Sequence, residues 1–261
     1  MSSFWRLVHN ENIKIYIRVR TWVMLGILLL TALAVPVLLL LASDQIGLWD
    51  GAMLTTWVCF FLLTIFTVIV GADIVAGEFS WGTIKLLLIR PWSRTKILIS
   101  KYIAIILFSL LGTVLLTAGS IIMSALALAP GALIPVGEGS GLSPAQYAFA
   151  MILTKYVTLF IILTFAFMVS SVFRSGALAI GLSLGILFFQ NFVGTILLFL
   201  QGRAEWVKYL LVSHLDLSVY IDSPVSEIGT TLGFSITVLA AYYIVFLVVS
   251  WLVFVKRDVS S

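Results

Sequence analysis

Few side chains in this sequence could act on a substrate, and they lie far apart along the chain. Lys155 is the only charged residue inside a long apolar run, where an ionised lysine costs about 3 kcal/mol on insertion scales. Either it lines a transport cavity, or residues 145–155 form an outer-leaflet helix from which its ammonium reaches the surface. Gln190 and Asn191 lie near the middle of another run and either contact a substrate or bridge helices. These three residues are the candidates for a substrate pathway.

The motifs of several enzyme classes are missing. No G-x-x-x-x-G-K-[ST] sequence is present, so the chain has no P-loop that could hold ATP phosphates. There is no H-E-x-x-H motif, and His9 and His214 fall on opposite sides of the membrane in the topology below, which argues against a zinc site. The single cysteine, Cys59, excludes an intrachain disulfide and a CxxC pair. We therefore expect a protein that is not itself an enzyme and binds no cofactor.

The composition is that of a membrane protein. Apolar and aromatic residues make up 62% of the 261 residues and charged residues 10%, against about 25% charged residues in a soluble domain. This excludes a cytosolic enzyme, a nucleic-acid-binding domain and a disordered chain. Six uncharged or nearly uncharged runs are long enough to cross a hydrocarbon core of about 30 Å as helices. They are Trp22–Ala42, Ala52–Ala72, Tyr102–Ala129, Tyr147–Phe173, Ala177–Leu200 and Ile228–Val255.

The distribution of basic residues predicts the orientation. Six spans place both termini on one side, and the connectors on that side hold twelve Lys and Arg residues, whereas the opposite connectors hold two. Positive charge marks the cytoplasmic side of a membrane protein. We therefore expect an all-α, multi-pass protein of the cell membrane, with residues 1–261 forming a single transmembrane domain and both termini cytoplasmic. The net charge of +4 then reflects orientation among membrane lipids and not a nucleic-acid partner.

Two connectors have more pattern than a simple turn requires. Residues 1–21 mix apolar and charged side chains as an amphipathic helix at the membrane interface would, or they form only a basic anchor for the first span. Residues 201–227 on the outer side place apolar residues at helical spacing. They form either short re-entrant helices that dip into the outer leaflet or an interfacial loop with aromatic anchors.

A third connector, residues 73–101, predicts a structured element on the cytoplasmic face. Gly77 permits a break after the second span, and an apolar stripe that includes Trp81 and Leu87 favours a short amphipathic helix from Glu78 to Ile89. Pro91 ends this helix, and Ser93 is suited to cap the next span. A soluble partner could act on such an element.

This connector resembles the signature of type-2 permeases of ATP-binding cassette (ABC) exporters. The residues that carry the resemblance are Glu78, Gly82, Thr83, the leucines 86–88, Pro91, Ser93, Arg94, Ile97, Leu98 and Lys101. Six spans with cytoplasmic termini, an N-terminal interfacial helix and re-entrant outer helices also match that family. The resemblance implies a bacterial exporter subunit that pairs with a second permease copy or a paralogue. It also implies two cytosolic ATPase subunits, which use ATP and Mg²⁺.

In that family the connector after the second span is the coupling helix, which sits in a groove of the ATPase. The resemblance places Glu78, Gly82, Thr83, Pro91 and Arg94 in this element. Trp81 and Leu87 are candidate apolar anchors in the partner's groove. The simpler interpretation is that Glu78 and Arg94 only pair at the interface and that Gly82 only permits packing.

The sequence thus predicts the membrane-spanning permease subunit of an ABC exporter, which forms the substrate pathway. The alternatives are a secondary transporter or channel that works without ATP, and a membrane scaffold for a soluble partner. Seven acidic and two basic residues in the outer connectors favour a cationic substrate, unless this balance only follows from the orientation rule.

Overall fold

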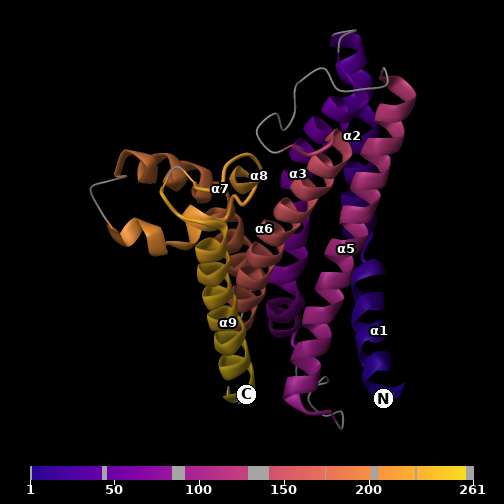
Figure 1. The fold of residues 1–261 in the computed structure, drawn as a ribbon. Helices are drawn as coiled ribbons and strands as arrows, with labels where there is room; N and C mark the ends of the chain where they lie inside the picture. Colours follow the sequence, from indigo (N-terminus) through magenta and orange to yellow (C-terminus); the bar gives the residue numbers. More distant parts are fainter. Residues whose placement is uncertain are drawn as a thin grey trace.

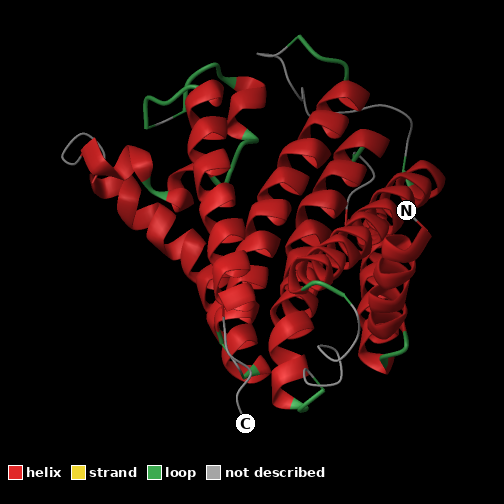
Figure 2. Ribbon diagram, turned by 90° about the horizontal axis from the view of Figure 1, so that it is seen from below, coloured by secondary structure: helices red, strands yellow, loops and turns green. Residues whose placement is uncertain are grey.

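The computed structural model describes residues 2–42, 46–83, 92–128, 141–173, 175–200, 205–226 and 228–256, without the side chains of residues 2, 3 and 190–200. Helices dominate this part of the chain (Figure 1; Figure 2). They are α1 (Ser2–Tyr16), α2 (Val19–Ala42), α3 (Leu48–Ser80), α5 (Arg94–Ala127), α6 (Pro144–Val172), α7 (Gly176–Leu200), the 3₁₀ helices η1 (Glu205–Tyr209) and η2 (Leu211–His214), α8 (Val219–Asp222) and α9 (Leu232–Lys256). The all-helical prediction is confirmed for these residues.

Five of these helices are long and apolar enough to cross a membrane, namely α2, α3, α5, α6 and α9. The chain is therefore a multi-pass helical membrane protein. The predicted fifth span corresponds to α7, in which the apolar stretch searched, Gly176–Phe189, is shorter than a full span. The sixth crossing stays a prediction.

Helix α3 is the centre of the bundle and packs against α2, α5, α6 and α7. Its most apolar stretch is 61% buried, whereas the corresponding stretches of α2 and α9 are 22% buried. Close packing depends on small residues: a side-chain carbon added at Gly112 of α5 would lie 2.4 Å from Leu63 of α3. The large apolar side chains that α2 and α9 leave exposed fit the lipid that would surround them.

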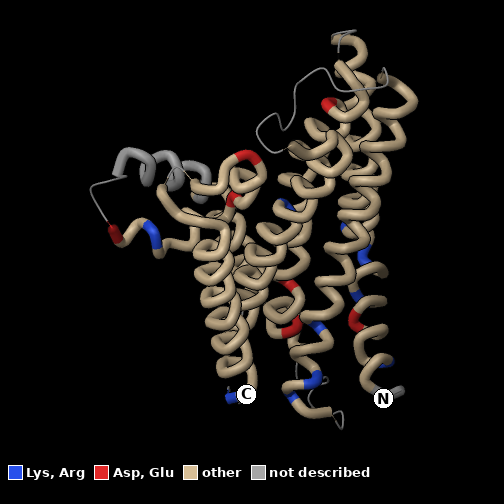
Figure 3. The backbone as a smooth tube through the Cα atoms, in the orientation of Figure 1, with Lys and Arg blue, Asp and Glu red and all other residues tan. Residues whose placement is uncertain are grey.

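The N-terminal helix α1 lies alongside α5 instead of standing apart from the bundle (Figure 1). Leu7, Glu11 and Ile15 form its buried face, while Trp5 and Ile13 are exposed on the other side. The predicted amphipathic helix is therefore present. Its apolar stripe packs on protein at the end of the bundle where both chain termini lie and where most charged residues gather (Figure 3).

The structure corrects the predicted break at Gly77, because α3 continues through this residue to Ser80. A side-chain carbon at Gly77 would lie 2.7 Å from the Asp73 carboxylate, so the glycine makes room for that group within an unbroken helix. A turn follows at residues 81–83, where Gly82 has a φ of +71°, a value that favours glycine. Most of the predicted short helix, with Leu87 and Pro91, lies outside the described residues.

Two further expectations concern helix boundaries. Ser93 caps α5, and its hydroxyl accepts a hydrogen bond from the Lys96 amide at 3.4 Å, as predicted. Helix α6 is continuous from Pro144 to Val172, so residues 145–155 are helical and not set apart from the span; their place in the outer leaflet stays a prediction. The predicted outer segment holds the short helices η1, η2 and α8.

Candidate functional site

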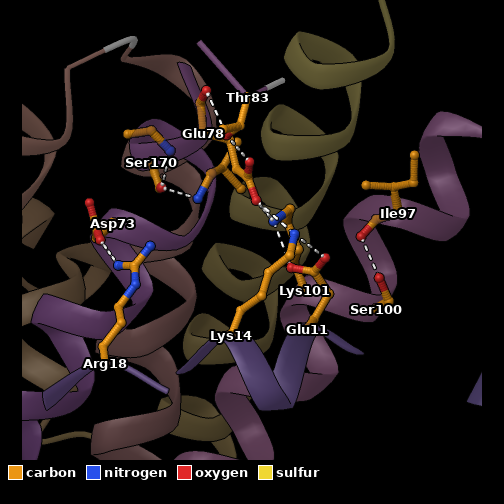
Figure 4. Close-up of polar contacts among 12 residues, drawn as sticks. Glu11, Lys14, Arg18, Asp73, Glu78, Thr83, Ile97, Ser100, Lys101 and Ser170 are labelled. Atoms are coloured by element: carbon orange, nitrogen blue, oxygen red, sulfur yellow. Dashed lines mark hydrogen bonds and ion pairs between the residues drawn. The ribbon is translucent and has the colours of Figure 1, made fainter. Parts of the chain in front are cut away.

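A group of charged side chains joins four helices near the end of α3 (Figure 4). We call it the charged joint. It consists of Glu11 and Lys14 of α1, Arg18 and Arg20 at the turn into α2, Asp73 and Glu78 of α3, and Lys101 of α5.

The first half of the charged joint is a ring of alternating charges. Lys101 lies 2.7 Å from Glu11 and 3.2 Å from Glu78, and Lys14 lies 2.8 Å from Glu11 and 2.9 Å from Glu78. The side chains of Lys101 and Glu11 are each only 1% exposed. Each buried charge thus has partners of opposite sign, which the cost of desolvation requires. The ring fixes α1, α3 and α5 to one another.

The ring also explains the protonation state of Lys14. Burial of its ammonium lowers the pKa of Lys14, but the charges and hydrogen bonds of Glu11 and Glu78 outweigh burial and raise this pKa above its ordinary value. The ring therefore holds Lys14 in its charged form. A cavity of about 20 Å³ beside the ring has room for about one water molecule.

The second half of the charged joint is centred on Asp73. Its carboxylate accepts hydrogen bonds from the guanidinium groups of both Arg18 and Arg20. A side-chain carbon at Gly176, the first residue of α7, would lie 2.9 Å from the same carboxylate, so the positive end of the α7 dipole is close to it. The Gly176 amide also donates to the Ser80 hydroxyl at 3.0 Å. The start of α7 is thus seated on the end of α3.

The turn after α3 contacts both halves of the charged joint, the ring and the group centred on Asp73. The Thr83 hydroxyl donates to the Glu78 carboxylate, and the Arg18 guanidinium lies 5.1 Å from the centre of the Trp81 ring, within the range of a cation–π contact. Trp81 is nevertheless 71% exposed. An aromatic side chain is therefore presented to the surroundings on a turn whose base is held by ion pairs.

The structure brings together four of the seven predicted coupling residues: Glu78, Trp81, Gly82 and Thr83. Leu87 and Pro91 lie outside the described residues. The predicted pairing of Glu78 with Arg94 is wrong. The ion-pair partners of Glu78 are Lys14 and Lys101, whereas Arg94 donates to the Val255 carbonyl at 2.9 Å and so connects α5 with α9.

Sequence reasoning singled out Glu78 and Lys101 as part of the family resemblance but missed the other members of the charged joint, because it counted Lys14, Arg18 and Arg20 only as orientation signals. One signal was present. Lys101 occupies the middle of an i, i+4, i+8 stripe with Ile97 and Ile105, and Glu11 does the same with Leu7 and Ile15. A charge in the middle of an apolar helix face is expected to be buried and paired.

The predicted substrate-pathway residues lie in a different part of the molecule. Lys155 is 3.2 Å from Asp216 of the outer segment, and its side chain is 18% exposed. Burial raises the pKa of Asp216, but hydrogen bonds from Ser218 and the charge of Lys155 outweigh it and hold this pKa below its ordinary value. The side chains of Gln190 and Asn191 lie outside the described part. Within that part, no group of three or more His, Cys, Asp or Glu residues could hold a metal ion.

Comparison with known proteins adds a family and two relatives. A family model described as "Protein of unknown function (DUF2705)" matches residues 21–260. The uncharacterized protein YhcI of Bacillus subtilis (strain 168) is 33% identical, over 98% of this chain and 99% of its own length. The uncharacterized membrane protein YdbK of the same organism is 30% identical, over 76% of this chain and 78% of its own.

The charged joint predicts an asymmetry between single and double substitutions. Lys101→Met leaves the buried Glu11 carboxylate with Lys14 alone, and we expect it to destabilise the fold by about 3 kcal/mol, the usual effect of breaking a buried pair. The double variant Glu11→Leu/Lys101→Met removes both charges and leaves the Lys14–Glu78 pair, so it should regain most of this loss.

The measurement is the thermal unfolding midpoint of the purified proteins in one detergent. Lys96→Met, at an exposed lysine of the same helix, is the matched control and should leave the midpoint near that of the wild type. A Lys101→Met protein as stable as the Lys96→Met control would contradict the structural importance of the ring.

Proposed function

The chain belongs to the DUF2705 family, and we propose that it is the membrane-spanning permease subunit of an ABC exporter. Its helices form the substrate pathway, and it pairs with a second permease, either a copy of itself or a paralogue. Two separate cytosolic ATPase subunits bind below it and supply the energy from ATP and Mg²⁺. The chain itself hydrolyses nothing.

One observation carries this proposal: the charged joint at the base of the exposed turn of α3. Helices α3 and α5 have 33 and 34 residues, or about 50 Å at 1.5 Å per residue, so they exceed a hydrocarbon core of about 30 Å. Their ends can project from the membrane toward a soluble partner. A force on the turn that carries Trp81 would pass through Glu78 and Asp73 into neighbouring helices, which is what coupling requires.

Most charged residues gather at the end of the bundle that holds the charged joint (Figure 3), and this supports an orientation in which that end faces the cytoplasm. In the proposal, α1 lies at the cytoplasmic interface and both termini are cytoplasmic. The short outer helices η1, η2 and α8 then lie on the external side of the cell membrane.

Labelling of single cysteines tests this orientation. In a Cys59→Ala background, Lys96→Cys should be protected from an impermeant maleimide added to intact bacteria, and Lys208→Cys should react. Both lysines are exposed, and both cysteines should react once the cells are permeabilised. A reactive Lys96→Cys together with a protected Lys208→Cys would reverse the proposed topology.

Retention of an ATPase tests the proposed function. The tagged full chain, purified from its native bacterium in mild detergent, should retain an ATPase whose activity depends on Mg²⁺. Because an exposed aromatic anchor typically contributes more than 1 kcal/mol to an interface, Trp81→Ala should reduce the retained activity at least fivefold.

The matched control is Trp206→Ala in the outer segment, where the tryptophan is 57% exposed. It should retain the wild-type amount of ATPase. Absence of any ATPase from the wild-type preparation would argue for a transporter that works without ATP. Equal losses in the two variants would remove Trp81 from the coupling surface.

A further inference from the structure

A second feature, remote from the charged joint, is a groove between α3, α6 and α7. Its volume is about 390 Å³, within the range of pockets that bind small molecules. Lys155 lies 15 residues before Ser170, or about 22 Å along α6, and the Ser170 hydroxyl accepts from the Val75 amide beside the charged joint. The groove therefore lies toward the opposite end of the bundle.

The walls of the groove are mainly apolar and aromatic. Helix α3 contributes Trp57, Phe60 and Phe61, α6 contributes Ile162, and α7 contributes Leu187. Phe60 and Leu187 are buried in the wall, whereas Trp57 is 59% and Phe61 41% exposed. The groove thus opens to the surface along an aromatic edge, a form that suits an alkyl chain.

Two charged groups line this groove, the mostly buried Lys155 and the more exposed Asp216. The Lys155 ammonium has three donors, and in the described part of the chain Asp216 is its one ion-pair partner. Asp216 lies at the rim with a 60% exposed side chain, and its Oδ1 atom also accepts from the amide and hydroxyl of Ser218. The carboxylate is therefore supported by water and Ser218, whereas the ammonium has donors left for a ligand.

We propose that this groove binds a single-chain amphiphile with an anionic head group. The alkyl chain lies along Trp57, Phe61 and Leu187, and the anionic group accepts hydrogen bonds from Lys155, in exchange for Asp216. The proposal holds whether or not an ATPase binds to the chain, because it concerns binding alone.

The sign of the ligand charge follows from burial. Lys155 is the more buried partner and lies within a spanning helix, where an ionised lysine is costly, so an added anion gains most there. A cation would have to be bound by Asp216, whose side chain is 60% exposed, so water already solvates this carboxylate and an added cation gains little there. Local geometry thus opposes the cationic preference that the net charge of the outer connectors indicates.

Photolabelling of the full chain in phosphatidylcholine nanodiscs, without nucleotide, tests the proposal. Three probes share one dodecyl chain with a terminal diazirine and differ in the head group: phosphate, trimethylammonium or hydroxyl. We expect the phosphate probe to label α3 and α7 residues of the groove at about tenfold lower concentration than the other two. Unlabelled dodecyl phosphate should compete, whereas inorganic phosphate at the same concentration should not.

Variants assign the preference to Lys155. Lys155→Gln should weaken labelling by the phosphate probe about tenfold, Lys155→Arg should retain it, and Asp216→Asn should leave it unchanged or stronger. Lys208→Gln, at an exposed lysine of the outer segment, is the control and should behave as the wild type.

Equal labelling by the three probes of the wild type would overturn the proposal without any variant. Labelling that is strongest for the trimethylammonium probe and lost in Asp216→Asn would reverse the sign of the ligand. If inorganic phosphate competes as strongly as dodecyl phosphate, the anionic group alone accounts for binding. The proposed role of the alkyl chain would then be wrong.

Discussion

Two opposite charges, Glu11 of α1 and Lys101 of α5, lie almost entirely out of water. Each needs opposite charges beside it, because an uncompensated charge there would cost several kcal/mol, and Lys14 and Glu78 complete the set. This constraint sets the position of α1 on α5. The ion pairs of Lys14 and Glu78 attach the end of α3 to the same group of charges. The Asp73 carboxylate, earlier in α3, lies beside the start of α7.

The rest of the structure can be understood from this arrangement. Small residues such as Gly112 let the apolar helices approach one another closely. The ion pairs add contacts that join α1, α3 and α5 at one end of the bundle. They also leave the turn with Trp81 exposed on a fixed base, while the groove near Lys155 lies about 22 Å away along α6. The proposed coupling turn at one end and the proposed binding groove at the other fit the proposed transport subunit.

The apolar runs predicted the helices well, because length and hydrophobicity decide helix formation in lipid. The N-cap of Ser93 and the short helices of the outer segment followed from local pattern. Gly77 misled, because a glycine that makes room for a carboxylate has the same sequence signal as one that breaks a helix. The partners of Glu78 and Lys155 come from residues 64 and 61 positions away, and only the packed fold brings such residues together.

We infer that the charged joint holds α1 and the ends of α3 and α5 as one rigid body. The most direct measurement is the distance distribution between spin labels at Ile13 of α1 and Lys96 of α5, both exposed, by pulsed electron paramagnetic resonance in a Cys59→Ala background. The account predicts one narrow distribution that becomes broad in Lys101→Gln. A distribution that is already broad with Lys101 present, or one unchanged by Lys101→Gln, would contradict it.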